Sequence, residues 1–196
     1  MHAIVLLMGA LLAGGPRPPP AAPLERRLVL DERQGRRLEL VRTAPAETTP
    51  PIEGALELVE LGVRRRLADR VAAAGLLPDG VLAIRDGALL KLDLAGRTRA
   101  VLAKGLAPEL EIDPSGSRVA LVRPLPAGGS AIEVLELAAG DARPVSVVSS
   151  GGYNNAPAFA PDGKTLLFVS TRTGLSSVFR VGLDGSGEKQ LTNRTL

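Results

Sequence analysis

The sequence predicts an all-β fold, an incomplete or small β-propeller of about three to five blades of antiparallel strands. One basis for this prediction is residues 155–192, which contain four short strands joined by tight turns. A second basis is that the same pattern occurs twice upstream. A third is that the central strands are apolar on both faces, as expected for a sheet packed between neighbouring sheets.

Residues 155–192 carry the clearest version of the pattern. The triplet Pro161-Asp162-Gly163 is a tight-turn signal, because proline presets φ and glycine accepts positive φ. An apolar strand follows at residues 166–169, and residues 178–183 then alternate between apolar and polar positions. The glycine-rich turn 184–187 leads into a last short strand, and residues 157–159 are expected to form the first strand.

Two earlier segments repeat this turn and the strand after it. Pro114-Ser115-Gly116 precedes the apolar residues 119–122, and Pro78-Asp79-Gly80 precedes residues 81–84. The spacing of the three copies brackets the roughly 40 to 50 residues of a four-stranded blade. Each copy continues into a further strand that ends at a glycine-containing turn, and these strands are residues 89–94, 132–137 and 178–183. At least three blades are therefore predicted.

Upstream of residue 76 the pattern is weaker. Residues 56–61 fit the same strand with Gly62 as its turn, and residues 24–41 resemble a hairpin that turns at residues 32–35. Residues 43–51 form a proline-rich loop. A helical alternative remains open, in which Gly75 is a C-cap and the apolar residues recur at helix spacing: Leu56, Val59, Val63, Leu67 and Val71. Strands are favoured.

The N-terminus indicates export. An apolar run at residues 3–13 precedes small residues and a proline tract, so residues 1–22 are predicted to be a signal peptide with a Pro-rich linker. The run is too short for a stable membrane span, although an uncleaved segment would act as an anchor. The expected location is the periplasm or outside the cell. Residues 23–75 are predicted to form weak N-terminal strands or hairpins, and residues 76–196 the propeller blades.

The charge pattern argues against a nucleic-acid partner. The chain has 24 basic and 21 acidic side chains, which are interspersed, and its formal net charge is +3. The basic clusters at residues 36–37 and 64–66 lack the interleaved aromatic residues that stack on bases in single-strand binders. These clusters are interpreted as solvated strand edges.

Residues 155–192 resemble the repeat of the TolB-like (WD-like) β-propellers, which reads approximately P-x-[WF]-S-P-D-G-K-x-[IL]-x-F-x-S-x-R-x-G, then a strand, D-x-D-G and L-T. The sequence departs from this repeat at Ala160, Thr171 and Thr173, and the two upstream copies lack its aromatic residue. The resemblance covers roughly residues 76–192, with no counterpart of the separate α/β domain of TolB. The matching residues are Pro157, Phe159, Pro161, Asp162, Gly163, Lys164, Leu166, Phe168, Ser170, Arg172, Gly174, Asp184, Gly185, Leu191 and Thr192.

The number of blades predicts a truncated or partial propeller. Closed propellers have about four to eight blades, whereas three are convincing here and the N-terminal hairpins add one or two. An open ring exposes blade faces and strand edges, which predicts self-association through these edges.

The residue types exclude several chemistries. The sequence has no cysteine, and its single histidine, His2, lies in the predicted signal peptide. Ser-His-Asp and Cys-His catalysis and zinc sites with His or Cys ligands are therefore excluded in the mature chain. Asp162 and Asp184 lie in turns, where turn chemistry explains them better than acid–base catalysis. No metal and no cofactor are predicted.

These observations predict a non-catalytic periplasmic module that binds a protein partner or a ligand, as the resemblance also implies. The alternative is the propeller portion of a peptidase- or glycan-type hydrolase whose catalytic part is missing. The predicted partner-binding residues, taken to lie in exposed loops beside the clearest blade, are Tyr153, Asn154, Asn155 and Arg172. A structural role, in which the asparagines bridge strands or cap turns, is the competing interpretation.

Overall fold

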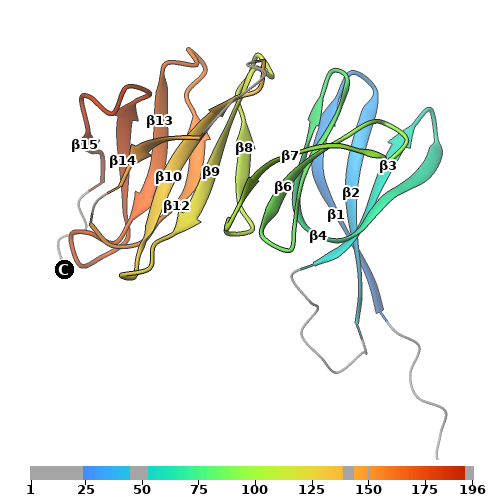
Figure 1. The fold of residues 1–196 in the computed structure, drawn as a ribbon, viewed down its shortest axis with the longest axis horizontal. Coiled ribbons are helices and arrows are strands. Elements are labelled where there is room, and N and C mark those ends of the chain that lie inside the picture. The colour runs from blue at the N-terminus through green and yellow to red at the C-terminus, as the bar shows by residue number, and fades with distance from the viewer. Residues whose placement is uncertain (1–23, 45–52, 139–143, 150, 193–196) are drawn as a thin grey trace, which may run out of the picture.

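The computed structural model describes residues 24–44, 53–138, 144–149 and 151–192, and these residues form fifteen antiparallel strands without a helix (Figure 1). Among them there is accordingly no helix that could span a membrane. The strands are β1 (Leu24–Arg33), β2 (Arg36–Ala44), β3 (Gly54–Glu60), β4 (Val63–Leu77), β5 (Gly80–Arg85), β6 (Ala88–Leu92), β7 (Thr98–Lys104), β8 (Leu110–Ile112), β9 (Arg118–Pro124), β10 (Ser130–Glu136), β11 (Val145–Val148), β12 (Asn154–Phe159), β13 (Thr165–Ser170), β14 (Ser177–Gly182) and β15 (Lys189–Gln190).

The strands are arranged as four blades. Strands β8–β11 and β12–β15 are separate four-stranded sheets, whereas β1–β7 form one sheet. Within that sheet β4 has two roles, because its first half pairs with β3 and its second half with β5. The chain bends between the two halves at Arg70, which has a φ of 57°. The first blade is therefore β1 to early β4, the second is late β4 to β7, the third is β8–β11 and the fourth is β12–β15.

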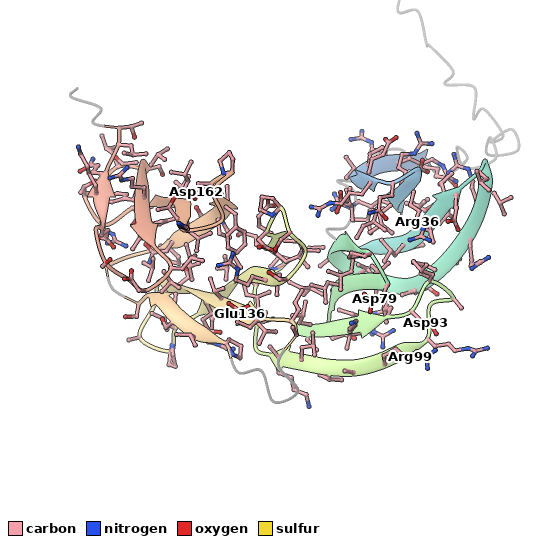
Figure 2. The ribbon with its side chains drawn as sticks, turned by 90° about the horizontal axis from the view of Figure 1, so that it is seen from above. Arg36, Asp79, Asp93, Arg99, Glu136 and Asp162 are labelled. Atoms are coloured by element: carbon pink, nitrogen blue, oxygen red, sulfur yellow. The ribbon has the colours of Figure 1, made fainter. Side chains whose placement is uncertain are left out.

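The four blades form an arc that does not close. Seen from above, the first and fourth blades lie at opposite ends of a curved row (Figure 2). The first strand of each blade lies on the inner side, where β1 neighbours β4, β4 neighbours β8, and β8 neighbours β12. These inner strands line the concave side of the arc.

The turn triplets have the predicted positions. Pro78-Asp79-Gly80, Pro114-Ser115-Gly116 and Pro161-Asp162-Gly163 each connect the first and second strands of a blade, and Gly80 is already the first residue of β5. The predicted hairpin at residues 24–41 is β1 with β2, and residues 56–61 lie in or just after β3. The helical alternative for residues 56–75 is wrong, because this segment is β3 and β4.

Apolar side chains fill the three interfaces between blades. The central pair in the last interface is Phe168 and Phe179, whose ring centroids lie 5.6 Å apart. Burying side chains of this size stabilises the fold by about 1.5–3 kcal/mol each. The three clusters centre on Leu38, Leu56, Leu76 and Val81; on Leu82, Ile84, Leu89, Val119 and Leu121; and on Ile132, Val134, Leu166, Phe168 and Val181.

The predicted signal peptide and most of the proline-rich loop lie outside the described residues. The predicted boundary between residues 75 and 76 falls inside β4, where this strand pairs with β5. The described strands thus run continuously from the N-terminal region into the second blade.

Candidate binding surface

The structure separates the four predicted binding residues into two kinds. Tyr153 is 61% exposed immediately before β12, and Asn155 is half-buried in that strand. Asn154, which was expected in an exposed loop, is fully buried. Its side-chain Nδ2 donates to the carbonyl of Ser130 at 2.6 Å, and its backbone N–H donates to the Ser130 hydroxyl at 2.7 Å. Asn154 therefore joins the fourth blade to the third, which agrees with the structural interpretation.

Arg172 is also mostly buried rather than presented from a loop. Its guanidinium lies over the rings of Phe168 and Phe179, 5.3 and 4.9 Å from their centroids. Its Nη2 donates to Asn154 Oδ1 at 2.9 Å, and it forms an ion pair with Glu188. Cation–π contacts and charge-assisted hydrogen bonds hold the side chain against its own blade. Tyr153 and Asn155 are thus the accessible members of the predicted set.

The concave side of the arc contains an open groove of about 360 Å³. All four inner strands, or the residues just before them, contribute to its wall. The side chains that line it are apolar apart from one carboxylate, and backbone groups contribute further polar surface. Such a mixture is typical of sites that bind ligands through shape and a few polar contacts. The groove is lined by Leu30, Ala72, Ala73, Ala74, Pro108, Glu109, Leu110, Ala156 and Pro157.

The backbone of β12 is irregular where it lines the groove. The pairing of β12 with β13 shifts between Asn155 and Ala158, and Ala156 has a φ of 49°. The Ala156 N–H donates to the carboxylate of Glu109 from the preceding blade, at 2.7 Å. A left-handed conformation costs energy in a residue with a Cβ, and Glu109 helps to hold it.

A second carboxylate lies on the same side of the arc. Glu111, in β8, lies near Asp31 and Arg33 of β1. Loss of hydration in this concave setting raises the pKa of Glu111; Arg33 opposes the shift and Asp31 adds to it. Asp31 in turn accepts the backbone N–H of Leu76 at 2.9 Å. The concave side therefore combines an apolar wall with acidic groups.

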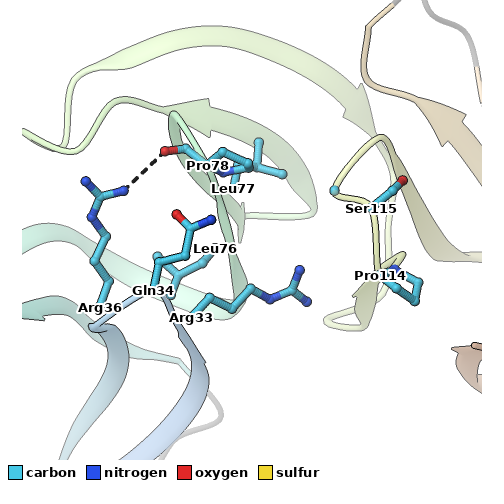
Figure 3. A pocket seen from close by; sticks show the side chains of 9 residues that line it. Arg33, Gln34, Arg36, Leu76, Leu77, Pro78, Pro114 and Ser115 are labelled. Carbon is cyan, nitrogen blue, oxygen red and sulfur yellow. Dashed lines mark hydrogen bonds between the residues drawn. The ribbon is translucent and has the colours of Figure 1, made fainter.

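A smaller pocket of about 130 Å³ lies between the turns of the first three blades (Figure 3). Arg36 donates to the carbonyl of Pro78 at 3.2 Å and pairs with Glu60 at 2.9 Å. Arg33 pairs with Asp31 at 3.1 Å. Because carboxylates already hold both guanidinium groups, this pocket is a weaker candidate than the groove.

Comparison with solved structures identifies the architecture. TolB from Acinetobacter baumannii superimposes with a TM-score of 0.59 at 19% sequence identity, over 71% of this chain and 38% of TolB. The fold is that of a TolB-like β-propeller. No protein-family model matches the sequence, and no curated protein sequence matches it either.

The TolB-like arc also superimposes on propellers of enzymes. Oligogalacturonate lyase matches with a TM-score of 0.59 at 12% identity, over 90% of this chain and 61% of the lyase. Acylaminoacyl peptidase from Pyrococcus horikoshii matches with a TM-score of 0.58 at 11% identity, over 86% of this chain and 32% of the peptidase. The chain thus spans less than two thirds of each of these proteins, and the likeness concerns the fold alone.

Carboxylates in the turns of the TolB-like blades cap backbone groups. Asp113 is 1% exposed and accepts the N–H groups of Ser117 and Arg118 at 2.8 and 2.9 Å. Burial would raise the pKa of Asp113, but hydrogen bonds from Ser115 and these N–H groups, with the Arg118 charge, hold it below its ordinary value. Asp162 accepts the Lys164 N–H, and Asp184 accepts the Ser186 N–H. Across the described ranges no group of three or more acidic or histidine side chains is placed to bind a metal ion.

Proposed function

We propose that this chain is a non-catalytic binding module of the periplasm, which holds a protein segment or a ligand in the groove on its concave side. The observation that carries the proposal is that all four blades contribute to one groove. Its small side chains leave the backbone of the inner strands accessible. Because β1, β8 and β12 are edge strands of their sheets, an extended segment can bind by hydrogen bonds to the main chain as well as by apolar contact.

The acidic groups define the chemistry of the bound segment. Glu109 already accepts the Ala156 N–H. Glu111, on the same side, is accessible to solvent, and partial burial raises its pKa. A cationic side chain near Glu111 would stabilise its charged form, and small apolar side chains would fit the wall formed by Ala72, Ala73 and Ala74. We therefore expect a basic and apolar segment.

The proposal can be tested by site-specific photocrosslinking in cells. A photoreactive amino acid at Tyr153, beside the start of β12, should form a specific adduct with the partner. The matched control is Val101, which is 52% exposed on β7 at the outer side. Ala72→Trp, which fills the groove at a position outside the apolar core, should abolish the Tyr153 adduct and leave the chain folded. Equal adducts at Tyr153 and Val101, or an adduct that Ala72→Trp does not reduce, would contradict the proposal.

The second candidate is the propeller portion of a hydrolase. The similarity to the folds of oligogalacturonate lyase and acylaminoacyl peptidase favours it. The purified chain would then cleave glycans or peptides when combined with a catalytic partner, and Asp113→Asn would affect this only through stability. Turnover by the chain alone that both Asp113→Asn and Asp162→Asn abolish would refute the non-catalytic proposal.

A further inference from the structure

The first and fourth blades each have one sheet face that no other blade covers among the described residues, and these two faces differ in residue composition. Each blade has a forward face, toward the next blade in the sequence, and a backward face, toward the preceding blade. At the three internal interfaces both faces are apolar. The forward faces carry Leu38, Leu40, Leu56 and Leu58 in the first blade, Leu82, Ile84 and Leu89 in the second, and Ala120, Ile132 and Val134 in the third.

The fourth blade keeps this composition on its forward face. In β13, Leu167 and Val169 alternate with Leu166 and Phe168, which are buried against the third blade. Val178 pairs with Val169, so the three aliphatic side chains lie together on the free face. They are half-buried within the sheet, with no further blade over them among the described residues. This face therefore has the composition of an interface between blades.

The backward face of the first blade is different, because ion pairs cover it. Glu39 is 4% exposed, and its carboxylate lies 3.1 Å from Arg27, 3.0 Å from Arg37 and also against Arg64. Arg27 also binds Glu57 at 2.7 Å. The hydrogen bond from Arg64 is the main cause that lowers the pKa of Glu39. Terminal units of repeat arrays need a polar outer face to remain soluble, and the backward face of the first blade has such a surface.

Two cations lie beside the aliphatic side chains of the fourth blade. Arg180 is paired with Leu167 on one side and with Lys189 on the other in the sheet register. Both cationic side chains are exposed, and no carboxylate of the described ranges lies within ion-pair distance of either. The forward face thus combines an apolar centre with a positive rim, which is complementary to an apolar surface that has carboxylates at its edge.

We propose that the forward face of the fourth blade is a docking surface for a further propeller blade, one with an apolar backward face and carboxylates opposite Arg180 and Lys189. This surface is separate from the concave groove. A second copy of the chain does not fit this surface. Its own fourth-blade face carries the same cations, and its first-blade face is covered by arginines that are already ion-paired. Association of two copies through open strand edges, as the sequence predicts, would leave this face free.

The test uses a blade of known composition as its probe. A second copy of residues 149–192 is appended after Thr192, so that its Leu166, Phe168, Phe179 and Val181 can pack on the forward face as they do on the third blade. The readout is the rate of protease cleavage inside the appended repeat. The control carries Leu167→Asp and Val178→Asp in the original fourth blade only. Docking should slow cleavage at least about tenfold relative to this control. Equal cleavage rates in the two chains would overturn the proposal.

A second pair of variants tests the charge of the rim. Val134 in the third blade occupies the position that Arg180 occupies in the fourth. Leu183 of the fourth blade packs at the edge of the cluster that contains Val134. In the appended repeat, Leu183 would therefore lie near Arg180 of the original blade. Leu183→Glu in the appended repeat should slow cleavage further, and Arg180→Glu in the original blade should remove that gain.

Light scattering on the unextended chain completes the test. A dimer that Leu167→Asp dissolves would show that a second copy occupies this face, and the proposal would be wrong.

Discussion

Ser130 and Asn154 form the shortest polar connection between the third and fourth blades. The Ser130 hydroxyl donates to the Asn154 carbonyl at 2.6 Å and accepts the Asn154 N–H at 2.7 Å, and both residues are buried. Ser130→Ala should lower the free energy of unfolding by about 1–3 kcal/mol, because it removes two hydrogen bonds from buried backbone groups. Urea unfolding measures this change. Ser146→Ala, at an exposed position of β11, is the control and should have little effect; equal effects would contradict the assigned role.

Glu39 makes the stability of the first blade depend on pH. Its folded-state pKa lies below its ordinary value of 4.5, so its stabilisation is fully present above pH 4.5 and is lost as pH falls through the folded pKa. Glu39→Gln should therefore destabilise the chain at pH 7, and its difference from wild type should shrink below pH 4.5. Chemical unfolding at a series of pH values tests this. The exposed Glu136→Gln is the control, and a pH-independent difference for Glu39→Gln would be inconsistent with this account.

Glu111 has the opposite effect on stability from Glu39. Its folded-state pKa is raised, so its ionisation opposes folding above pH 4.5 and this cost disappears as the pH falls below that value. Glu111→Gln should raise the midpoint of thermal unfolding at pH 7 and leave it unchanged in acid. A lower midpoint at pH 7 would show that Glu111 is paired in the folded chain rather than held ready for a cation.

For single residues, the sequence did not predict which polar side chains of the candidate site are exposed and which are buried. Asn154 and Arg172 are polar residues next to turn signals, and such residues are usually solvated. Asn154 is buried against Ser130, which lies 24 residues away in another blade. Arg172 is held over two rings that come together only when β13 pairs with β14. The groove had a local signal in the alanines before two of the turn triplets, Ala72–Ala74 and Ala156. The sequence could not show that these segments face one another.

At the scale of the elements, the turn of the second blade packs against the first blade. Gly96 has a φ of 84°, and a Cβ added there would overlap the Leu67 carbonyl in β4. Gly96→Ala should therefore destabilise the chain by about 1 kcal/mol or more beyond the cost of its backbone strain. Gly62→Ala is the matched control, since Gly62 has a similar φ of 79° with open space around it. Equal unfolding midpoints for the two variants would show that this contact is absent.

The strands that follow turn triplets were predictable because proline, glycine and β-branched residues give strong local signals. The long strand β4 was not predictable in the same way. Its residues Leu67 and Val71 fit helix spacing, and Ala72–Ala74 have little strand preference. Pairing with β3 on one half and β5 on the other decides its conformation, so tertiary contacts override the local pattern.

At the scale of the whole molecule, the open arc leaves the concave groove accessible and gives the chain two unlike ends. The sequence predicted a partial propeller of three to five blades, and the structure has four (Figure 1). The blades were predictable because they repeat. The ion-paired cover on the first blade was not, since its arginines and glutamates resemble any solvated strand edge until the strands are placed side by side.

The distance between the first and fourth blades tests the open arc most directly. The chain has no cysteine, so spin labels on Val29→Cys in β1 and Arg180→Cys in β14 report one defined distance by pulsed electron paramagnetic resonance. The arc predicts a single narrow distribution at several times the roughly 10 Å that separates packed sheets. A distribution centred near that sheet spacing would mean that the first and fourth blades touch and that the ring is closed, which would contradict the open arc and both binding surfaces argued from it.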